Sequence, residues 1–458
     1  MKIASKDQSA VELVREALDK AHQYQNEYQV FNWINDEAIK QAEEIDRRIA
    51  NGETVGRLAG VPYALKDNFL SKAGETTASA LILEGFKSPV TATAVKKLEA
   101  EGAIMIGRTN LDAFAHGSST ENSYYGPTKN SKDTERVAGG SSGGSAVAVA
   151  LGIVPFATGT DTGGSIRQPA SFNGVYGLKP TYGAISRYGV VAMASSTDCV
   201  GFFAREAEDL DLLMEVCAGQ DANDLTSLPD YYAASEAEEG PKKIGIIKDF
   251  DNEAIDSEIR NTLKQKIAEL EAKGHEIVEL EMPALKYALA AYYIIVPAEV
   301  SSNLSRHDGV RYAYRSEEAQ TLDQLYEHTR GEGFMPENKR RIMIGNFVLS
   351  SGFYDAYYIK AAKARTVIIN EYQKAFEQCD FILSPVSPNP AFKLGAKVND
   401  PVAMYLEDVL SVPLNLAGLP GLSVPVGQTA EGLDLGLQLV GPRRSDKSLI
   451  KFAQELKG

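Results

Sequence analysis

Residues 139–144 read Gly-Gly-Ser-Ser-Gly-Gly, and residues 159–165 read Gly-Thr-Asp-Thr-Gly-Gly-Ser. Each loop adjoins an apolar run, and 24 positions separate Ser141 from Ser165. Glycine lets backbone N–H groups approach a ligand closely and permits dihedral angles that other residues avoid. One such loop alone is more typical of a turn. Two at this spacing, each presenting a serine, indicate a site.

Outward from the loops, short apolar runs alternate with helical patterns. The apolar runs lie at residues 60–65, 103–106 and 153–157, and the helical patterns at 91–101 and 145–151. This alternation predicts an α/β fold in which helices cover a sheet. Two amphipathic helices are predicted earlier in the chain, the first from the capping-box spacing of Ser9 and Glu12 and the second from Ile39, Ala42, Ile45 and Ile49.

A polar, acidic stretch at residues 219–243 is predicted to be a surface connection. The α/β pattern then resumes, with an apolar run at 244–247, a helix over 259–270 and a strand at 277–280. We interpret the chain as one domain over residues 1–458, with a core at about 58–210, the acidic connection, and a second lobe at about 244–458.

The composition excludes several classes of protein. The formal net charge of −15 and the pI of about 5.0 predict a surface that repels phosphate backbones, so nucleic acid would have to be held by another subunit. Three cysteines, far apart and without C-x-x-C spacing, argue against a disulfide framework or a zinc site. Segment 1–8 predicts neither a signal nor a transit peptide, and no apolar run has the length of a membrane span. A cytoplasmic location is therefore expected.

Lys66 is a candidate base for the two loop serines. A serine hydroxyl is a weak nucleophile until a base removes its proton, and a lysine can act as that base when it is neutral. Lys66 ends the apolar run 60–65, where desolvation would lower its pKa. Together, Lys66, Ser141 and Ser165 indicate a Ser-Ser-Lys acyl-transfer site.

Other interpretations of the glycine-rich loops fit less well. Neither loop has the spacing of a P-loop or of a dinucleotide-binding turn, so nucleotide binding by these loops is not expected. Residues 139–143 match G-x-S-x-G, the nucleophile elbow of α/β-hydrolases, and later histidines exist at His275, His307 and His328. That alternative leaves Ser165 and Lys66 unexplained. The five histidines have no metal-ligand spacing, so no metal is predicted in this chain.

These motifs resemble the amidase signature family, whose members hydrolyse amides with a lysine base, a bridging serine and a nucleophilic serine. The resemblance implies a large central mixed, twisted β-sheet covered by helices on both faces. It also implies that Lys66 is the base, that Ser141 relays the proton after a cis Gly140–Ser141 peptide, and that Ser165 attacks the carbonyl. The implied oxyanion hole consists of backbone N–H groups, from Thr162, Gly163, Gly164 and Ser165.

Within that family the sequence is most similar to the A subunits of glutamyl-tRNA(Gln) and aspartyl-tRNA(Asn) amidotransferases. The similarity includes residues 159–180, 340–345, 354–358 and 415–421. It implies that Arg341 and Asp408 bind the carboxylate and ammonium of glutamine, with Arg340 as the alternative arginine. The implied partners are B and C subunits in a heterotrimer, with ATP, Mg and tRNA bound through the B subunit and no cofactor in this chain.

Two positions depart from the family's usual pattern. An acidic residue is usual at Ala113 and an aromatic one at His307, and both could touch the substrate pocket or a subunit boundary. Apart from these departures, two alternative functions stay open. One is a stand-alone amidase acting on another small amide, and the other is a non-catalytic scaffold subunit.

Overall fold

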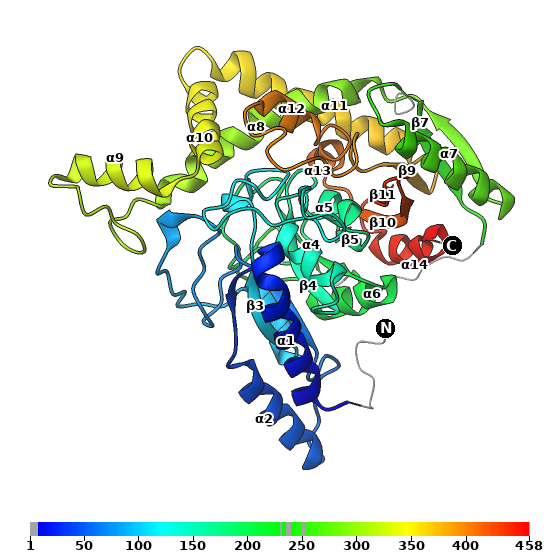
Figure 1. The fold of residues 1–458 in the computed structure, drawn as a ribbon. Coiled ribbons are helices and arrows are strands. Elements are labelled where there is room, and N and C mark those ends of the chain that lie inside the picture. The colour runs from blue at the N-terminus through cyan, green and yellow to red at the C-terminus, as the bar shows by residue number, and fades with distance from the viewer. Residues whose placement is uncertain (1–7, 230, 235–239, 249–251, 458) are drawn as a thin grey trace.

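The computed structural model describes residues 8–229, 231–234, 240–248 and 252–457 (Figure 1). Within these residues eleven strands form one sheet, in the order β1-β3-β2-β4-β6-β5-β10-β11-β9-β7-β8. The strands are β1 Phe31–Ile34, β2 Pro62–Lys66, β3 Ile104–Thr109, β4 Phe156–Asp161, β5 Tyr176–Lys179, β6 Cys199–Ala204, β7 Lys243–Ile247, β8 Glu276–Leu280, β9 Phe381–Pro385, β10 Gly421–Gln428 and β11 Asp434–Val440. β2 is parallel to β3 and β4, β7 is parallel to β8 and β9, and the other pairs are antiparallel. The predicted mixed sheet is confirmed.

Helices cover both faces of this sheet (Figure 1). Their bounds are α1 Ala10–Tyr28, α2 Ala38–Ala50, α3 Thr93–Ala100, α4 Gly143–Ala150, α5 Arg167–Phe172, α6 Ala207–Cys217, α7 Ser257–Ala272, α8 Ala288–Asn303, α9 Leu322–Gly333, α10 Pro336–Leu349, α11 Lys360–Ala375, α12 Pro401–Leu406, α13 Val412–Ala417 and α14 Asp446–Lys457. Three apolar cores pack helices against the sheet. The first contains α3, α6, α7 and α14, the second contains α8, α11 and α13, and the third contains α1, α2, α4 and α5.

The pleat of β2 explains the position of its last residue. Tyr63 and Leu65 lie in the core beneath α3 and α6, whereas Ala64 lies in the core beneath α4. Because side chains alternate along a strand, Lys66 shares the face of Ala64. The lysine therefore points toward the start of α4, where the loop 139–144 ends.

Most of the predicted elements occur, with shifted ends. Ser9 caps α1 with the predicted capping box to Glu12. β4 begins at Phe156 instead of residue 153, because the chain first turns after α4. The sequence patterns did not identify β1, β5, β6 and β9 to β11. All of these except β1 are buried over half or more of their length. Short buried strands lack the alternation that marks a half-exposed strand.

Strands from both predicted parts of the chain belong to the same sheet, since β5 of the predicted core pairs with β10 of the predicted second lobe. Residues 230 and 235–239 of the predicted acidic connection lie outside the described residues, as do residues 1–7 of the N-terminal segment. Within the described part of the chain, no helix combines the length and hydropathy needed to cross a bilayer.

Candidate active site

Lys66 and Ser141 meet beneath α4. Lys66 Nζ donates hydrogen bonds to Ser141 Oγ and to Thr160 Oγ1, both at 2.9 Å. Lys66 and Ser141 are fully buried. The Gly140–Ser141 peptide is cis, as the family resemblance implied, and Gly140 N donates to Gln168 Oε1 at 2.9 Å. The lysine amine thus lies in direct contact with the first of the two loop serines.

Burial lowers the pKa of Lys66 from 10.5 to about 7, although nearby carboxylates oppose the shift. The carboxylates belong to Asp112, Asp161 and Asp198. A charged ammonium is disfavoured here because the protein interior replaces its hydration with few polar groups. A large fraction of the lysine is therefore neutral near pH 7, which is the state a general base requires.

The second serine loop lies against the first. Ser142 N donates to the carbonyl of Ser165 at 3.2 Å, and Ser142 Oγ donates to the carbonyl of Thr160 at 3.3 Å. Ser165 itself is 8% exposed, which makes it less enclosed than Lys66 or Ser141. The structure therefore brings all three residues of the predicted triad to one place, with Ser165 nearest to solvent.

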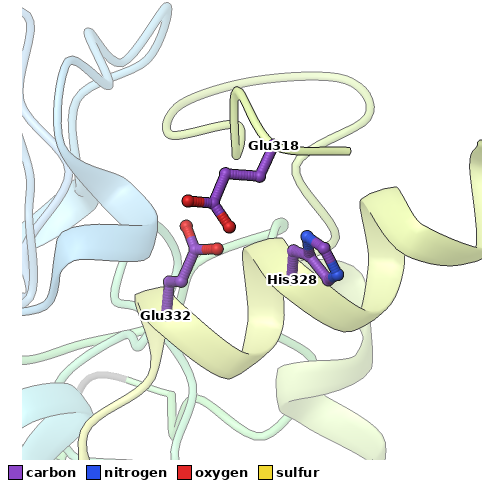
Figure 2. Close-up of side chains that lie close together, drawn as sticks. All are labelled: Glu318, His328 and Glu332. Atoms are coloured by element: carbon purple, nitrogen blue, oxygen red, sulfur yellow. The ribbon is translucent and has the colours of Figure 1, made fainter. Parts of the chain in front are cut away.

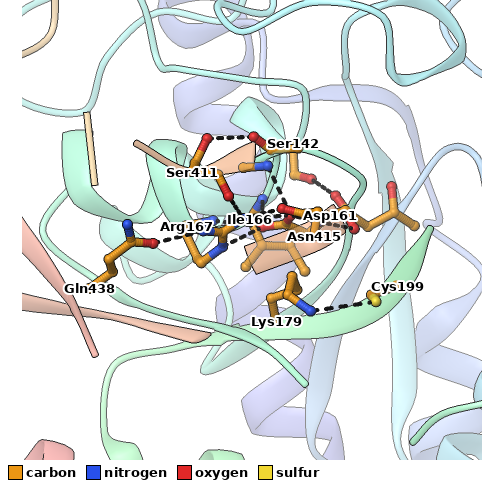
Figure 3. A network of polar contacts seen from close by, with 12 residues as sticks. Ser142, Asp161, Ile166, Arg167, Lys179, Cys199, Ser411, Asn415 and Gln438 are labelled. Atoms are coloured by element: carbon orange, nitrogen blue, oxygen red, sulfur yellow. Dashed lines mark hydrogen bonds and ion pairs between the residues drawn. The ribbon is translucent and has the colours of Figure 1, made fainter. Parts of the chain in front are cut away.

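A buried ion pair holds the Ser165 loop in shape (Figure 3). Asp161 accepts hydrogen bonds from Arg167 Nε at 3.0 Å and from the backbone N–H groups of Gly164 at 2.9 Å and Ile166 at 3.1 Å. Although burial opposes it, Arg167 keeps the pKa of Asp161 below its usual range. Arg167 also donates to Asn415 Oδ1 at 2.6 Å. This pair joins the Ser165 loop to α13, which lies far along the chain.

The implied oxyanion hole requires a correction at Gly164. Its N–H donates to the Asp161 carboxylate, so it does not point into the site. Among the residues that the structure describes, the N–H groups of Thr162, Gly163 and Ser165 have no hydrogen-bond acceptor. Three of the four predicted donors are therefore available to an oxyanion.

Two glycines are required where these loops pack closely. A Cβ on Gly140 would lie 2.1 Å from Asp112 Oδ2, and one on Gly164 would lie 2.4 Å from Ser411 Oγ. Gly164 also has a φ of +132°, which side chains rarely adopt. The glycines of both motifs therefore make room for neighbouring polar groups.

Arg341 and Asp408 both contact Tyr293. Arg341 is 3% exposed, stacks over the Tyr293 ring at 5.2 Å and donates from Nε to Glu337 Oε1 at 2.8 Å. Asp408 Oδ2 accepts from the Tyr293 hydroxyl at 2.7 Å, and Asp408 Oδ1 accepts from Ser118 Oγ at 2.7 Å. Burial raises the pKa of Asp408 to about 6, while both hydrogen bonds oppose this rise. A buried guanidinium and a buried carboxyl group therefore both contact the side chain of Tyr293.

Ser411 joins this pair to the Ser165 loop. Its hydroxyl lies within hydrogen-bonding distance of the Gly163 carbonyl and, at 3.1 Å, of the Asp408 carbonyl. Among the described residues, Arg341 Nη1 and Nη2 have no hydrogen-bond acceptor. The guanidinium can therefore still bind a carboxylate through its terminal nitrogens.

A cavity of about 290 Å³ lies beside Arg341. This volume is near the lower end of the ~300–1,000 Å³ typical of small-molecule sites. Its charged lining residues are Asp112, Glu121, Glu337, Arg340, Arg341 and Lys397. Neither Ser165 nor Asp408 lines this cavity, so it adjoins the site on the side of Arg341.

Comparison with known proteins identifies the family. The Amidase family model matches residues 12–450. The chain belongs to the amidase signature family. It is 50% identical to the A subunit of the glutamyl-tRNA(Gln) amidotransferase from Cyanothece sp., over 96% of this chain and 92% of the relative.

Solved amidases share the whole fold. The crystal structure of the corresponding A subunit of the glutamyl-tRNA(Gln) amidotransferase from Thermotoga maritima has a TM-score of 0.82 and 37% identity, covering 99% of this chain and 93% of that one. A peptide amidase from Stenotrophomonas maltophilia has a TM-score of 0.81 and 27% identity, covering 99% and 94%. The predicted amidase signature fold is confirmed. The α/β-hydrolase alternative is wrong, because Ser141 contacts a lysine in an amidase fold.

Several residues of this amidase site were not identified from the sequence. Thr160 lies in the second glycine-rich loop and Asp112 precedes Ala113, but no sequence pattern predicted that they lie next to Lys66 and Gly140. Tyr293 lies in α8, whose apolar residues surround the helix, so periodicity marks no functional face. The two departures lie beside the site: Ala113 O accepts from Asn338 Nδ2 at 2.8 Å, and His307 packs on Phe114 at 5.0 Å. Neither residue lines the cavity.

One group of side chains in the described part of the amidase could hold a metal ion. The ligand atoms of Glu318, His328 and Glu332 lie within 4.8 Å of one another (Figure 2). Both glutamates are exposed, and Glu332 Oε1 accepts from Ser316 Oγ at 2.9 Å. Hydroxyl groups therefore already satisfy part of this cluster. It lies at α9, which projects away from the sheet (Figure 1). The absence of a metal site in this chain stays a prediction.

The pH dependence of the amidase reports the protonation of Lys66. We expect kcat/KM to rise about tenfold per unit up to about pH 7 and to level off above it, because only the neutral amine accepts a proton. The plateau begins near pH 7 since burial lowers the pKa of Lys66 to about 7. Initial rates of ammonia release, measured in well-buffered solutions between about pH 5.5 and about pH 9, give kcat/KM at each pH. A value of kcat/KM that still rises about tenfold per unit at about pH 9 would contradict the assignment.

Proposed function

We propose that the chain is the glutaminase subunit of a tRNA-dependent amidotransferase, supplying ammonia that converts Glu-tRNA(Gln) to Gln-tRNA(Gln). The observation that carries this proposal is the buried pair Arg341 and Asp408 beside the Ser165 loop. A free amino acid has one carboxylate and one ammonium, and this pair offers a guanidinium fork and a carboxylate to them. The 50% sequence identity to an amidotransferase A subunit, over 96% of this chain, supports glutamine as the substrate.

The reaction begins at Ser165. Neutral Lys66 accepts the proton of Ser141 Oγ through their 2.9 Å contact, and Ser141 in turn accepts the proton of Ser165 Oγ. Ser165 Oγ then bonds to the amide carbon, whose π electrons move to the oxygen. The free N–H groups of Thr162, Gly163 and Ser165 stabilise that oxyanion.

Collapse of the tetrahedral intermediate breaks the carbon–nitrogen bond. The departing nitrogen takes back the relayed proton through Ser141 and leaves as ammonia, while the acyl group stays on Ser165 as an ester. Water then attacks the ester, with Lys66 and Ser141 removing its proton, and glutamate and the free Ser165 hydroxyl result.

The partners belong to the same proposal. B and C subunits would complete a heterotrimer, with ATP and Mg used through the B subunit and tRNA bound there. The net charge of −15 supports leaving tRNA to a partner. Aspartyl-tRNA(Asn) is a possible second acceptor of the ammonia. The cytoplasmic location expected from the sequence is also part of this proposal.

A stand-alone amidase is the second candidate function. It is favoured by the similar TM-scores of the peptide amidase and the amidotransferase protein, because the fold alone does not separate the two activities. Ammonia release should be measured from glutamine and from a panel of other amides, with and without co-expressed B and C subunits. Stronger release from glutamine in the complex supports the amidotransferase role. Turnover of other amides with none of glutamine would establish the stand-alone amidase.

Arg341 is expected to control glutamine affinity. Arg341→Met should raise KM for glutamine about 100-fold, because a charge-assisted pair with a carboxylate contributes roughly 1.5–3 kcal/mol. Arg340→Met is the comparison, and we expect it to have a much smaller effect since that side chain is 41% exposed and paired with Glu337. Steady-state kinetics measures both. A larger effect at Arg340 would move the head-group role to that residue.

A further inference from the structure

His116 is a fully buried histidine at the cavity wall. It follows the short 3-10 turn Ala113–Ala115, and its side chain is 0% exposed. Its backbone is well paired, since its N–H donates to the Ala113 carbonyl at 3.1 Å and its carbonyl accepts from Asn122 Nδ2 at 2.9 Å. The ring is different. Neither Nδ1 nor Nε2 has a hydrogen-bond partner among the described residues.

The imidazole is neutral. Burial, together with the smaller effect of the positive charge of Arg341, lowers the pKa of His116 to about 3. Glu337 and the carbonyls of Ala113 and Phe114 favour the charged form, but the ring reaches none of them with hydrogen-bonding geometry. A neutral imidazole carries one N–H donor and one acceptor nitrogen. Both are unpaired within the described part of the protein.

An unpaired polar ring in the interior is costly. A buried donor or acceptor without a partner costs about 1–3 kcal/mol, so such groups are rare in folded proteins. His116 lines the same 290 Å³ cavity as Arg341. The buried ring, with no partner among the described residues, therefore belongs to a residue of the wall that Arg341 also forms.

We propose that His116 binds the substrate, its ring N–H donating a hydrogen bond to the carboxylate that Arg341 holds. The proposal rests on the proposed function, because it takes the ligand to be an amino acid amide. A second cation here would compete with Arg341, whereas a neutral donor adds a hydrogen bond without adding charge. His116 is thus a specificity-determining contact, selecting amides that carry a carboxylate.

Replacement of the ring tests this contact by direct binding. Calorimetry with glutamine should use the full chain carrying Ser165→Ala, in complex with its partners if they co-purify, so that no substrate is consumed. We expect His116→Met to weaken glutamine binding about tenfold, the loss typical of one hydrogen bond to a charged group. His116→Gln keeps a donor and an acceptor and should restore most of the affinity. His307→Met is the matched control, because His307 is also buried and neutral but lies outside the cavity.

Stability separates a binding role from a structural one. Without ligand, His116→Met should raise the thermal midpoint, because it removes an unpaired polar ring. A lower midpoint with unchanged glutamine affinity would mean that His116 supports the fold, and it would overturn the proposal. Equal loss of affinity in His307→Met would overturn it as well.

Nuclear magnetic resonance adds a readout at the ring itself. The chain has five histidines, so labelling histidine with ¹⁵N gives few signals, and the His116→Met spectrum identifies the one from His116. We expect its ring N–H signal to move downfield when glutamine is added. No movement under saturating glutamine would contradict the contact. If glutamine binds in a His116-dependent way but no ammonia is released, this inference stands and the proposed activity does not.

Discussion

Ser165→Ala is expected to lower kcat for ammonia release from glutamine by at least about 10⁴-fold, because it removes the atom that bonds to the amide carbon. Residual activity would come only from the oxyanion donors and from binding. Substrate affinity should change little, since Arg341 and Asp408 stay in place. Single-turnover kinetics and calorimetry on the same protein separate these two effects.

Ser171→Ala is the matched serine control. Ser171 lies in α5, close in sequence to Ser165, and its hydroxyl bonds to Gly436 on β11 and not to the site. In the complex, Ser165→Ala should still form Gln-tRNA when ammonium is added, because only the ammonia source is lost. Full glutamine hydrolysis by Ser165→Ala would assign the nucleophile to another residue, with Ser141 as the first alternative.

Lys66→Met is expected to lower kcat about 10³-fold to 10⁴-fold, the range that a positioned general base contributes. Lys66→Arg should be equally slow, although it keeps a long basic side chain, because arginine does not lose its proton in proteins. The arginine variant thus separates proton transfer from the positive charge. Activity of Lys66→Arg near that of the wild type would contradict the role of Lys66 as base.

Lys66→Met is also expected to change the stability of the folded protein. The pKa of Lys66 in the folded protein is about 7, below its ordinary 10.5, so the unfolded chain binds a proton that the folded chain lacks between these values. The contribution of Lys66 to the free energy of unfolding therefore falls as the pH drops from about 10.5 to about 7. Below about pH 7 this contribution stays at its lower value. Lys66→Met is expected to raise the midpoint of thermal unfolding at pH 7. That result would show that its low activity does not come from misfolding.

Local sequence motifs were sufficient to predict the loop serines and the first helix cap. Ser141 and Ser165 stand in loops whose glycines are needed for packing against Asp112 and Ser411, and such requirements leave a readable pattern. The capping box at Ser9 and the pleat that turns Lys66 toward α4 follow from neighbours within a few residues. The substrate-binding roles of Arg341 and Asp408 are predictions from family resemblance, because no local pattern distinguishes these residues from a surface ion pair.

The errors also have physical causes. Gly164 was expected to offer its N–H to the oxyanion, but the neighbouring Asp161 carboxylate binds that group. The start of β4 was placed too early because the residues between α4 and the strand are as apolar as the strand itself. In both cases the competing arrangement depends on packing that local hydrophobicity does not describe.

The sequence by itself determined the α/β class, the loop serines, the lysine and the chemistry that they indicate, because these depend on strand pleat, helix caps and glycine. Only the tertiary structure decided which distant groups meet. Lys66 contacts Ser141 across 75 positions, and Ser118 contacts Asp408 across 290. It also decided that His116 lines a cavity while its buried ring has no partner among the described residues. Such contacts arise when helices pack on a sheet, and that packing is a property of the whole chain.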